Sequence, residues 1–138
     1  MHLTLVRKEE DASGTNGQIT IEGMPGIVFL TIEKPWRGNL PEVSRIPPKL
    51  HYRLVVQEGQ LHIVTVKGNA PLKGREGEEI RIMPGRDAAS LPGGSVGIVQ
   101  LHTALGRGFA PDAPYASLFD LVSGAMVADQ IILLEIRA

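Results

Sequence analysis

Apolar and polar residues alternate in short stretches along most of the chain, which is the pattern of half-buried β-strands. The alternation predicts strands at Leu3–Arg7 and Gln18–Glu22, with the cluster Gly14–Gly17 as the turn between them. A second turn at Gly23–Gly26 precedes Ile27–Ile32, which is apolar almost throughout. A run of this kind predicts a strand that is covered on both faces. The chain is therefore predicted to begin with a hairpin and a core strand.

The next segment, Lys34–Lys49, has a different composition. It carries four prolines and the lone Trp36, and Pro47-Pro48 holds the backbone in an extended, non-helical path. We predict a long loop that belongs to the domain rather than a linker between domains.

A second hairpin is predicted at Leu50–Gln57 and Gln60–Val66, joined by the two-residue turn Glu58-Gly59. If Gln57 faces Gln60, strand alternation divides the side chains between a core face and a wetter face. The core face would carry Tyr52, Leu54, Val56, Leu61 and Ile63, and the wetter face His51, Arg53, His62 and Val64. In this register the two histidines are about 13 Å apart, too far to share a metal ion.

The second half of the chain predicts two more strands, one helix and a last strand. The strands are Glu78–Met83 and Gly97–Thr103, separated by glycine and proline breaks. Asp112 is a candidate N-cap and Pro114 suits a first helical turn. Apolar residues then recur at helical spacing, at Tyr115, Leu118, Leu121, Val122 and Ala125. The β-branched and leucine-rich run Ile131–Ile136 predicts a strand that closes the sheet.

These elements predict a mainly β, α+β fold. We expect a single domain over residues 1–138, with a small mixed or antiparallel sheet or barrel, one C-terminal helix and a closing strand. The formal net charge of −1 gives no one-signed surface for nucleic acid or anionic lipid. No apolar run is long enough for a membrane helix, and no signal peptide is recognised at the start. The absence of cysteine excludes disulfides and thiolate catalysis.

Gly93–Gly97 matches the G-x-S-x-G motif, which in hydrolases raises a serine above a sheet on a strand-to-helix turn. In this chain the order of elements is different, because a loop is predicted before Ser95 and a strand after it, where the motif requires a strand before and a helix after. His102 also precedes Asp112 and Asp120, so the Ser-Asp-His order is missing. We therefore favour a plain glycine turn, and keep Ser95 with His102 as the pair for an alternative nucleophilic site.

The sequence evidence for calcium or anion binding is weaker. The acidic runs Glu9–Asp11 and Glu76–Glu79 lack the ligand spacing of a calcium loop, and we interpret them as solvated turns. Gly85-Arg86 and Gly106–Gly108 could offer amides and a guanidinium to an anion, but no phosphate-binding fingerprint accompanies them. The sequence therefore predicts no metal ion and no cofactor.

Two aromatic side chains are candidate interaction residues. Trp36 beside Arg37 could stack in a binding groove, or it could plug the end of the sheet, which we favour. His102 shares a strand face with Ile98 and Gln100, so it could enter a pocket, although a partly buried, hydrogen-bonded histidine is commoner.

Together these segments carry a family resemblance. Thr31–Asn39 (T-I-E-K-P-W-R-G-N) and Ser44–Pro47 (S-R-I-P) resemble the T-L-E-x-P-W-R-x-N … S-x-I-P signature of a phage and prophage family, a domain of unknown function. The family's later elements look like Ile80–Arg86, Ser95–Val99, Pro114–Met126 and Ile131–Ile136. The resemblance covers essentially the whole chain, strongly in its first third.

That family carries a histidine and an S-x-G-C pattern similar to those of L,D-transpeptidases, which cross-link peptidoglycan through a cysteine. In this sequence Met83 stands at the histidine position, Arg86 at an asparagine and Ile98 at the cysteine, while Ser95 and Gly97 keep the frame. A thioether cannot take a proton and an isoleucine cannot attack a carbonyl, so this acyl transfer is excluded. We expect the Met83 and Ile98 side chains to meet beneath the Ser95 loop and fill the former pocket.

The resemblance implies a non-catalytic phage-type β-domain that acts as a structural or protein-interaction module, a component of a virion or of a prophage-encoded assembly. Its expected partners are proteins, either phage particle proteins or further copies of the chain, in the bacterial host cytoplasm or the virion. One alternative is a protein that acts on or binds peptidoglycan through a non-cysteine nucleophile, with Ser95 and His102 as the pair. Another is a regulator that binds proteins through an exposed strand edge.

Overall fold

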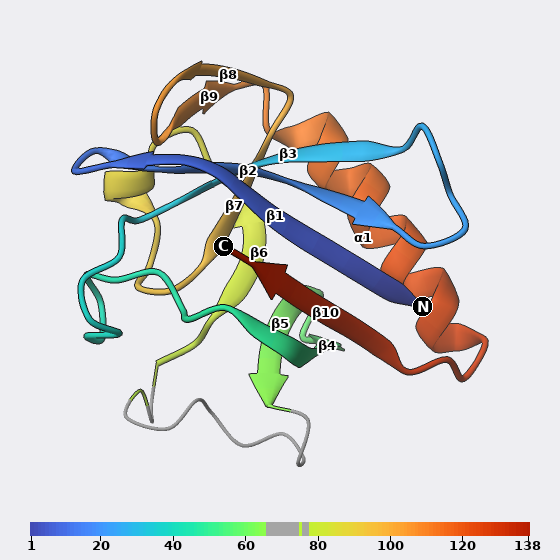
Figure 1. Cartoon of the computed structure of the whole chain (residues 1–138). Helices are drawn as coiled ribbons and strands as arrows, with labels where there is room; N and C mark the ends of the chain where they lie inside the picture. Colours follow the sequence, from blue (N-terminus) through green and yellow to red (C-terminus); the bar gives the residue numbers. More distant parts are fainter. Residues whose placement is uncertain (66–74, 76–77) are drawn as a thin grey trace.

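Eight strands close into a barrel in the computed structural model, which describes residues 1–65, 75 and 78–138 (Figure 1). The strand order around the barrel is β1-β10-β4-β5-β6-β7-β3-β2. Two neighbouring pairs are parallel, β1 with β10 and β6 with β7, and the others are antiparallel. The bounds are β1 His2–Asp11, β2 Gly14–Ile21, β3 Val28–Glu33, β4 Lys49–Gln57, β5 Gln60–Thr65, β6 Arg81–Pro84, β7 Val96–Val99 and β10 Ile132–Arg137.

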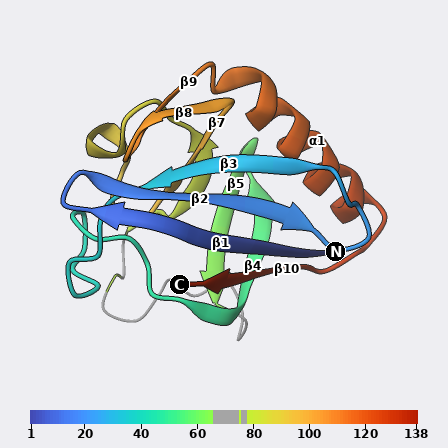
Figure 2. The same cartoon turned by 45° about the horizontal axis from the view of Figure 1, so that its top comes forward.

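Four further elements lie outside this barrel. Strands β8 (Leu101–Ala104) and β9 (Arg107–Phe109) form a separate two-stranded sheet, and a short 3-10 helix, η1, spans Ala88–Ser90. The α-helix α1 (Asp112–Val127) packs along one side of the barrel, and the β8–β9 hairpin lies beyond β3 (Figure 2). The predicted fold class is confirmed, with a mostly β domain, one helix near the C-terminus and a closing strand after it.

The core joins the inner face of the barrel to the inner face of the helix. Leu118 and Val122 of α1 are fully buried in one cluster with barrel residues such as Leu5, Tyr52 and Ile98. The predicted N-cap is wrong, because Pro111 occupies the cap position and Asp112 is the first helical residue. Its carboxylate still lies at the positive end of the helix dipole. No helix in the described residues is long and apolar enough to cross a bilayer.

The first hairpin turns elsewhere than predicted. β1 and β2 are joined at residues 12–13, whereas Gly14–Gly17 lies inside β2. A Cβ atom on Gly17 would lie 2.5 Å from the carbonyl oxygen of Val6, and one on Gly14 would lie 2.6 Å from the Cα of Gly106. These glycines therefore allow close backbone packing rather than a turn.

Two predicted strands also have different bounds. Gly97–Thr103 divides into β7 and β8, because the chain bends at Gln100, whose amide donates to Phe109 O at 3.0 Å. The strand predicted from Glu78 begins only at Arg81, and the backbone amide of Glu78 donates to the Arg75 carbonyl oxygen at 3.1 Å instead of to a neighbouring strand.

Three of the remaining predictions agree with the structure and two do not: Ile27 and Val28, at the start of the strand predicted to be covered on both faces, are 38% and 47% exposed, and Val64, predicted on the wetter face, is buried. The β4–β5 hairpin has the predicted Gln57–Gln60 register, and the described loop between β3 and β4 contains no helix or strand. β10 closes the barrel between β1 and β4. Val66 and residues 76–77, which belong to a predicted strand and a predicted acidic turn, lie outside the described residues.

Candidate functional site

The expected pocket between Met83 and Ile98 does not form. Met83 pairs with Gly97 and Pro84 pairs with Ile98, so Met83 and Ile98 lie on opposite faces of the sheet. Ile98 is fully buried in the barrel core, while Met83 packs outside the barrel against a smaller cluster that contains Leu91. The prediction that these two side chains fill one former active-site pocket is therefore wrong.

Ser95 and His102 are also held apart by their own hydrogen bonds. Ser95 is fully buried, and its Oγ accepts from the amide of Arg81 at 3.1 Å. His102 lies on β8 with its Nε2 2.8 Å from the carbonyl oxygen of Thr31. Arg86 is exposed, and its backbone carbonyl accepts from Gly108 at 2.9 Å. Each of these side chains or backbone groups thus has a local structural role.

His102 does enter a groove, as one of the two interpretations predicted. The groove has a volume of about 370 Å³ and lies between β8 and the outer face of β1, β2 and β3. Lys8, Gln18 and Leu30 line the barrel side of it. This surface is distinct from the loop that carries Trp36.

That loop, residues 34–48, is held by three clusters of charged side chains, which we call clamps. In the first, Arg7 and Glu33 lie inside the barrel with side chains only 3% and 1% exposed. Arg7 Nε and Nη2 donate to the two Glu33 carboxylate oxygens at 3.0 and 2.7 Å. Arg7 Nη2 also donates to the carbonyl oxygen of Ile46 at 2.8 Å. This clamp ties the end of the loop to β1 and β3.

The second clamp is centred on Glu10, at the end of β1. Its Oε1 accepts from Arg45 Nε at 2.6 Å, Thr15 Oγ at 2.7 Å and the amide of Trp36 at 3.1 Å. Burial alone would raise the pKa of Glu10, but the hydrogen bonds from Arg45, Thr15 and Trp36 lower it to about 2. The carboxylate is therefore ionised at neutral pH. It binds the loop near its beginning, at Trp36, and near its end, at Arg45.

The third clamp is the guanidinium of Arg75, which is completely buried. Its nitrogens donate to both carboxylate oxygens of Glu78, at 2.7 and 3.1 Å, and to Asn39 Oδ1 at 3.0 Å. They also donate to the backbone oxygens of Ser44 at 2.7 Å and Arg45 at 3.4 Å. These five contacts use all five N–H donors of an arginine, which explains how the charge can be buried.

Glu78 connects this clamp to two further backbone segments. Its Oε1 accepts from the amides of Glu42 at 3.2 Å and Gly94 at 3.1 Å. Burial by itself would raise the pKa of Glu78. The hydrogen bonds from Arg75 and from these two amides lower the pKa by more than burial raises it, so the net shift is downward. The interpretation of Glu10 and Glu78 as solvated turn residues is wrong, because both carboxylates bind arginine.

Two residues at fixed positions of the quoted signature, Glu33 and Asn39, accept side-chain hydrogen bonds in the clamps. Arg45, which stands at a variable position of that signature, donates to Glu10, and Ser44 Oγ accepts from the amide of Arg37 at 2.8 Å. Sequence reasoning missed the partners outside the signature, which are Arg7, Glu10, Arg75 and Glu78. Of these four residues, only Arg7 could have been suspected from the sequence. It occupies the next position in the series Leu3, Leu5, Arg7, where the alternation of β1 predicts an inward-facing apolar side chain.

The clamped loop exposes three apolar side chains. Trp36 is 40% exposed, Leu40 57% and Val43 50%, and we call these three residues the loop surface. Arg37, beside them, is exposed as well. The Trp36 ring lies against the guanidinium of Arg45, with 5.6 Å from Cζ to the ring centroid. The favoured prediction that Trp36 plugs the sheet is therefore wrong.

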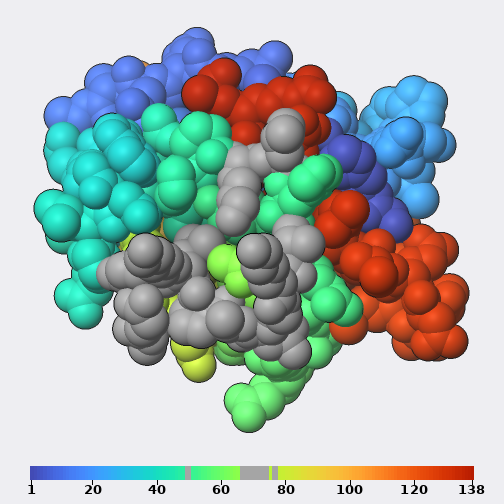
Figure 3. Space-filling view, turned by 60° about the horizontal axis from the view of Figure 1, so that its bottom comes forward, coloured from blue at the N-terminus to red at the C-terminus, as the bar shows by residue number. Residues whose placement is uncertain are grey.

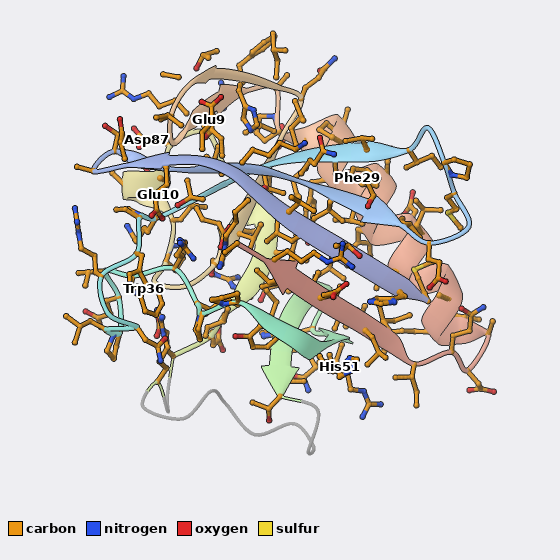
Figure 4. The ribbon with its side chains drawn as sticks, viewed as in Figure 1. Glu9, Glu10, Phe29, Trp36, His51 and Asp87 are labelled. Atoms are coloured by element: carbon orange, nitrogen blue, oxygen red, sulfur yellow. The ribbon has the colours of Figure 1, made fainter. Side chains whose placement is uncertain are left out.

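The loop forms one flank of the molecule. Figure 3 shows its cyan and teal atoms protruding next to the blue atoms of the N-terminal strands. Figure 4 places Glu10 and Trp36 on this flank and His51 away from it, on β4. Among the described residues, no group of three or more histidine, aspartate or glutamate side chains could hold a metal ion.

The fold and this flank define a small closed β-barrel that presents a rigidly held loop. Comparison with protein-family models, with curated proteins and with solved structures finds no match for this chain. The functional argument therefore rests on the chain's own residues and on the resemblance of its signature.

Proposed function

We propose that this protein is a non-catalytic protein-interaction module that binds its partner through the loop surface, Trp36, Leu40 and Val43. The observation that carries the proposal is the combination of three arginine–carboxylate clamps with exposed apolar side chains on the loop they hold. Fixing a long loop costs conformational entropy, roughly 1–2 kcal/mol for each residue. A loop that is already ordered before association loses less entropy when it binds.

The composition of the loop surface supports a protein partner. Tryptophan and arginine are enriched at the energetically dominant positions of interfaces. Trp36 is followed in sequence by the exposed Arg37, and its ring lies against the Arg45 guanidinium. Leu40 and Val43 are two further exposed apolar side chains of the same loop. Exposed apolar side chains accompanied by arginine fit a protein surface better than a small molecule.

The non-catalytic part of the proposal is supported by the position of Ser95. Its side chain is fully buried and its Oγ is bonded to the backbone of Arg81, so it is neither accessible nor activated. His102, the other member of the alternative catalytic pair, is bonded to Thr31 on β3. The alternative of a peptidoglycan-acting enzyme therefore gains no support from these two residues.

The phage context of the proposal rests on the signature in and around the loop. We propose that the partner is a phage particle protein or another copy of the chain, and that the module serves in a virion or a prophage-encoded assembly within the bacterial host. Mass spectrometry of purified particles from a strain that carries the gene tests this directly. Absence of the protein from the particles, together with a monomeric solution mass, would count decisively against it.

The binding surface is tested by Trp36→Ala, which removes the ring that lies against Arg45 but none of the hydrogen-bonding groups of the three clamps. A buried interface tryptophan contributes about 2 kcal/mol, so we expect partner affinity or particle incorporation to fall by about 30-fold. Val127→Ser is the matched control, because Val127 is an 86% exposed apolar residue on α1, outside the loop. Equal effects of the two substitutions would show that the loop surface is not the binding site.

A further inference from the structure

The two-stranded sheet of β8 and β9 has one covered edge and one free edge. The outer edge of β9 is covered, because the Gly108 amide donates to the Arg86 carbonyl oxygen at 2.9 Å and Asp87 forms an isolated bridge with Arg107. The outer edge of β8 pairs with no strand among the described residues. Since the main sheet is a closed barrel, β8 carries the free strand edge of the part of the chain that the structure describes.

The backbone of His102 points towards this free edge. In an antiparallel pair, two opposed residues exchange either both of their backbone hydrogen bonds or none. His102 is opposed to Gly108, whose amide is bound to Arg86, so these two residues exchange none. The N–H and C=O groups of His102 therefore point away from β9, and neither has a hydrogen-bond partner within residues 1–65, 75 and 78–138. Together they offer the donor and the acceptor that one residue of an adjacent strand requires.

The groove that His102 enters runs along the same edge. It has a volume of about 370 Å³, and residues 102–105 form one of its walls. Two side-chain contacts hold this wall over the barrel. His102 Nε2 lies 2.8 Å from the Thr31 carbonyl oxygen on β3, and Asn16 Nδ2 on β2 donates to the Ala104 carbonyl oxygen at 3.1 Å. The wall is therefore in place before any ligand binds.

The outer face of the barrel forms the floor of this groove. Leu30 contributes an apolar side chain and Gln18 an amide, while Lys8 and Glu9 contribute one charge of each sign. Figure 4 shows Glu9 beside the β8–β9 hairpin. The balanced charge favours neither an anion nor a cation as the ligand. Strand β8, with the sequence Leu-His-Thr-Ala, also lacks the lysine, proline or other charged residue that protects many exposed edges.

We propose that this groove binds an extended peptide segment of a partner protein, which adds as a strand to β8 at His102. Strand addition gains affinity from main-chain hydrogen bonds and specificity from alternate side chains. The bulge between His102 and Ala104 limits regular pairing to one residue, so Leu30 and Gln18 supply further contacts. The barrel floor beneath the edge leaves room for a single extended chain, but not for a strand that is covered by its own barrel, which excludes a second copy. The proposal goes beyond the proposed function, because the groove is separate from the loop surface.

The test selects peptides from a displayed library of short random sequences on the whole protein and measures the affinity of the best one, capped at both ends, by fluorescence anisotropy. We expect its amide NMR shifts to centre on residues 101–104 and 18. His102→Pro and His102→Ala both remove the imidazole, but only the proline removes the N–H at the free edge, where proline is tolerated. The proline variant should therefore bind about fivefold more weakly than the alanine variant, as expected for one backbone hydrogen bond. N-methylation of the peptide, scanned along its amides, should cause a similar loss at one position with the unaltered protein.

Three results would overturn the proposal. The first is a selection that yields no binding peptide. The second is equal affinity of the two His102 variants together with no effect of N-methylation at any position, which would mean that the edge takes no part. The third is a set of NMR shifts centred on Trp36 instead of β8, which would place peptide binding at the loop surface. This third result would support the proposed function while refuting the groove, so the failures of the two proposals can be told apart.

Discussion

The buried pair of Arg7 and Glu33 offers the sharpest test of the clamps. Glu33→Gln keeps the size of the side chain but removes the negative charge. The guanidinium of Arg7 is then left inside the barrel, 3% exposed, with the Ile46 carbonyl as its remaining strong acceptor. Removing one partner of a buried pair costs about 3–5 kcal/mol. This is a large part of the roughly 5–15 kcal/mol by which a domain is stable.

Urea unfolding measures this loss. With a slope of about 2 kcal/mol per molar urea, the Glu33→Gln midpoint should fall by about 2 M. The single tryptophan, Trp36, lies on the clamped loop, so its fluorescence reports the same transition. Glu22→Gln is the control, because the Glu22 side chain is 78% exposed and, within the described part of the chain, its carboxylate pairs with His2 alone. An exposed pair of this kind contributes about 0–1 kcal/mol.

The double substitution Arg7→Met with Glu33→Leu separates the cost of a lone charge from the value of the pair. It removes both charges, so we expect it to recover most of the stability that Glu33→Gln loses. The recovery should be incomplete, because the Ile46 carbonyl loses its donor. A loss below about 1 kcal/mol in Glu33→Gln would refute the reasoning, since it would place the pair in the range of exposed ion pairs.

Three further predictions follow from single residues. The depressed pKa of Glu10, about 2, means that its contribution is complete above the unfolded value near 4.5 and is lost as the pH falls towards 2. The stability difference between wild type and Glu10→Gln should therefore shrink over this range. Burial raises the pKa of Tyr52 to about 12, so its ionisation, followed by absorbance, should be delayed and stability should fall as the pH rises above 10. Gly17→Ala should destabilise by about 1–3 kcal/mol through overpacking, whereas Gly124→Ala, where a new Cβ meets nothing within 4 Å, should stabilise by about 0.5–1 kcal/mol.

Each of these predictions has a clear opposing result. A stability difference for Glu10→Gln that does not change between pH 5 and 2 would mean that the carboxylate is not held by Arg45. Titration of both tyrosines at their ordinary pKa near 10 would contradict the burial of Tyr52. Equal effects of the two glycine substitutions, measured by thermal unfolding, would show that the Val6 carbonyl yields to the new methyl group.

Local patterns predicted the strands well because burial on one face produces alternation. The β4–β5 hairpin is an example, with its register fixed by the Glu58-Gly59 turn. Gly14–Gly17 misled the prediction, since glycine serves tight packing as readily as turns. A closing last strand was predicted, but its parallel pairing with the first strand was not, because no local pattern links residues at opposite ends of the sequence.

The loop surface was partly predictable and its clamps were not. Trp36 and Arg37 stood out because a tryptophan in a proline-rich loop is unusual. The carboxylate of Glu10 and the guanidinium of Arg45 are 35 residues apart in sequence, and no local pattern indicates that they meet. The side chains of Met83 and Ile98 were expected to meet. In the parallel register of β6 and β7, Met83 pairs with Gly97 instead, and this offset of one residue places the two side chains on opposite faces of the sheet.

The pairing of β10 between β1 and β4 has a consequence for synthesis on the ribosome. Until β10 has emerged, β1 and β4 each have a free edge, and such edges invite pairing with other chains. The nascent domain is thus completed by its final strand, which inserts beside its earliest one. A pause or truncation before Ile132 would leave an open sheet at risk of aggregation, whereas the closed barrel leaves neither of these two edges free.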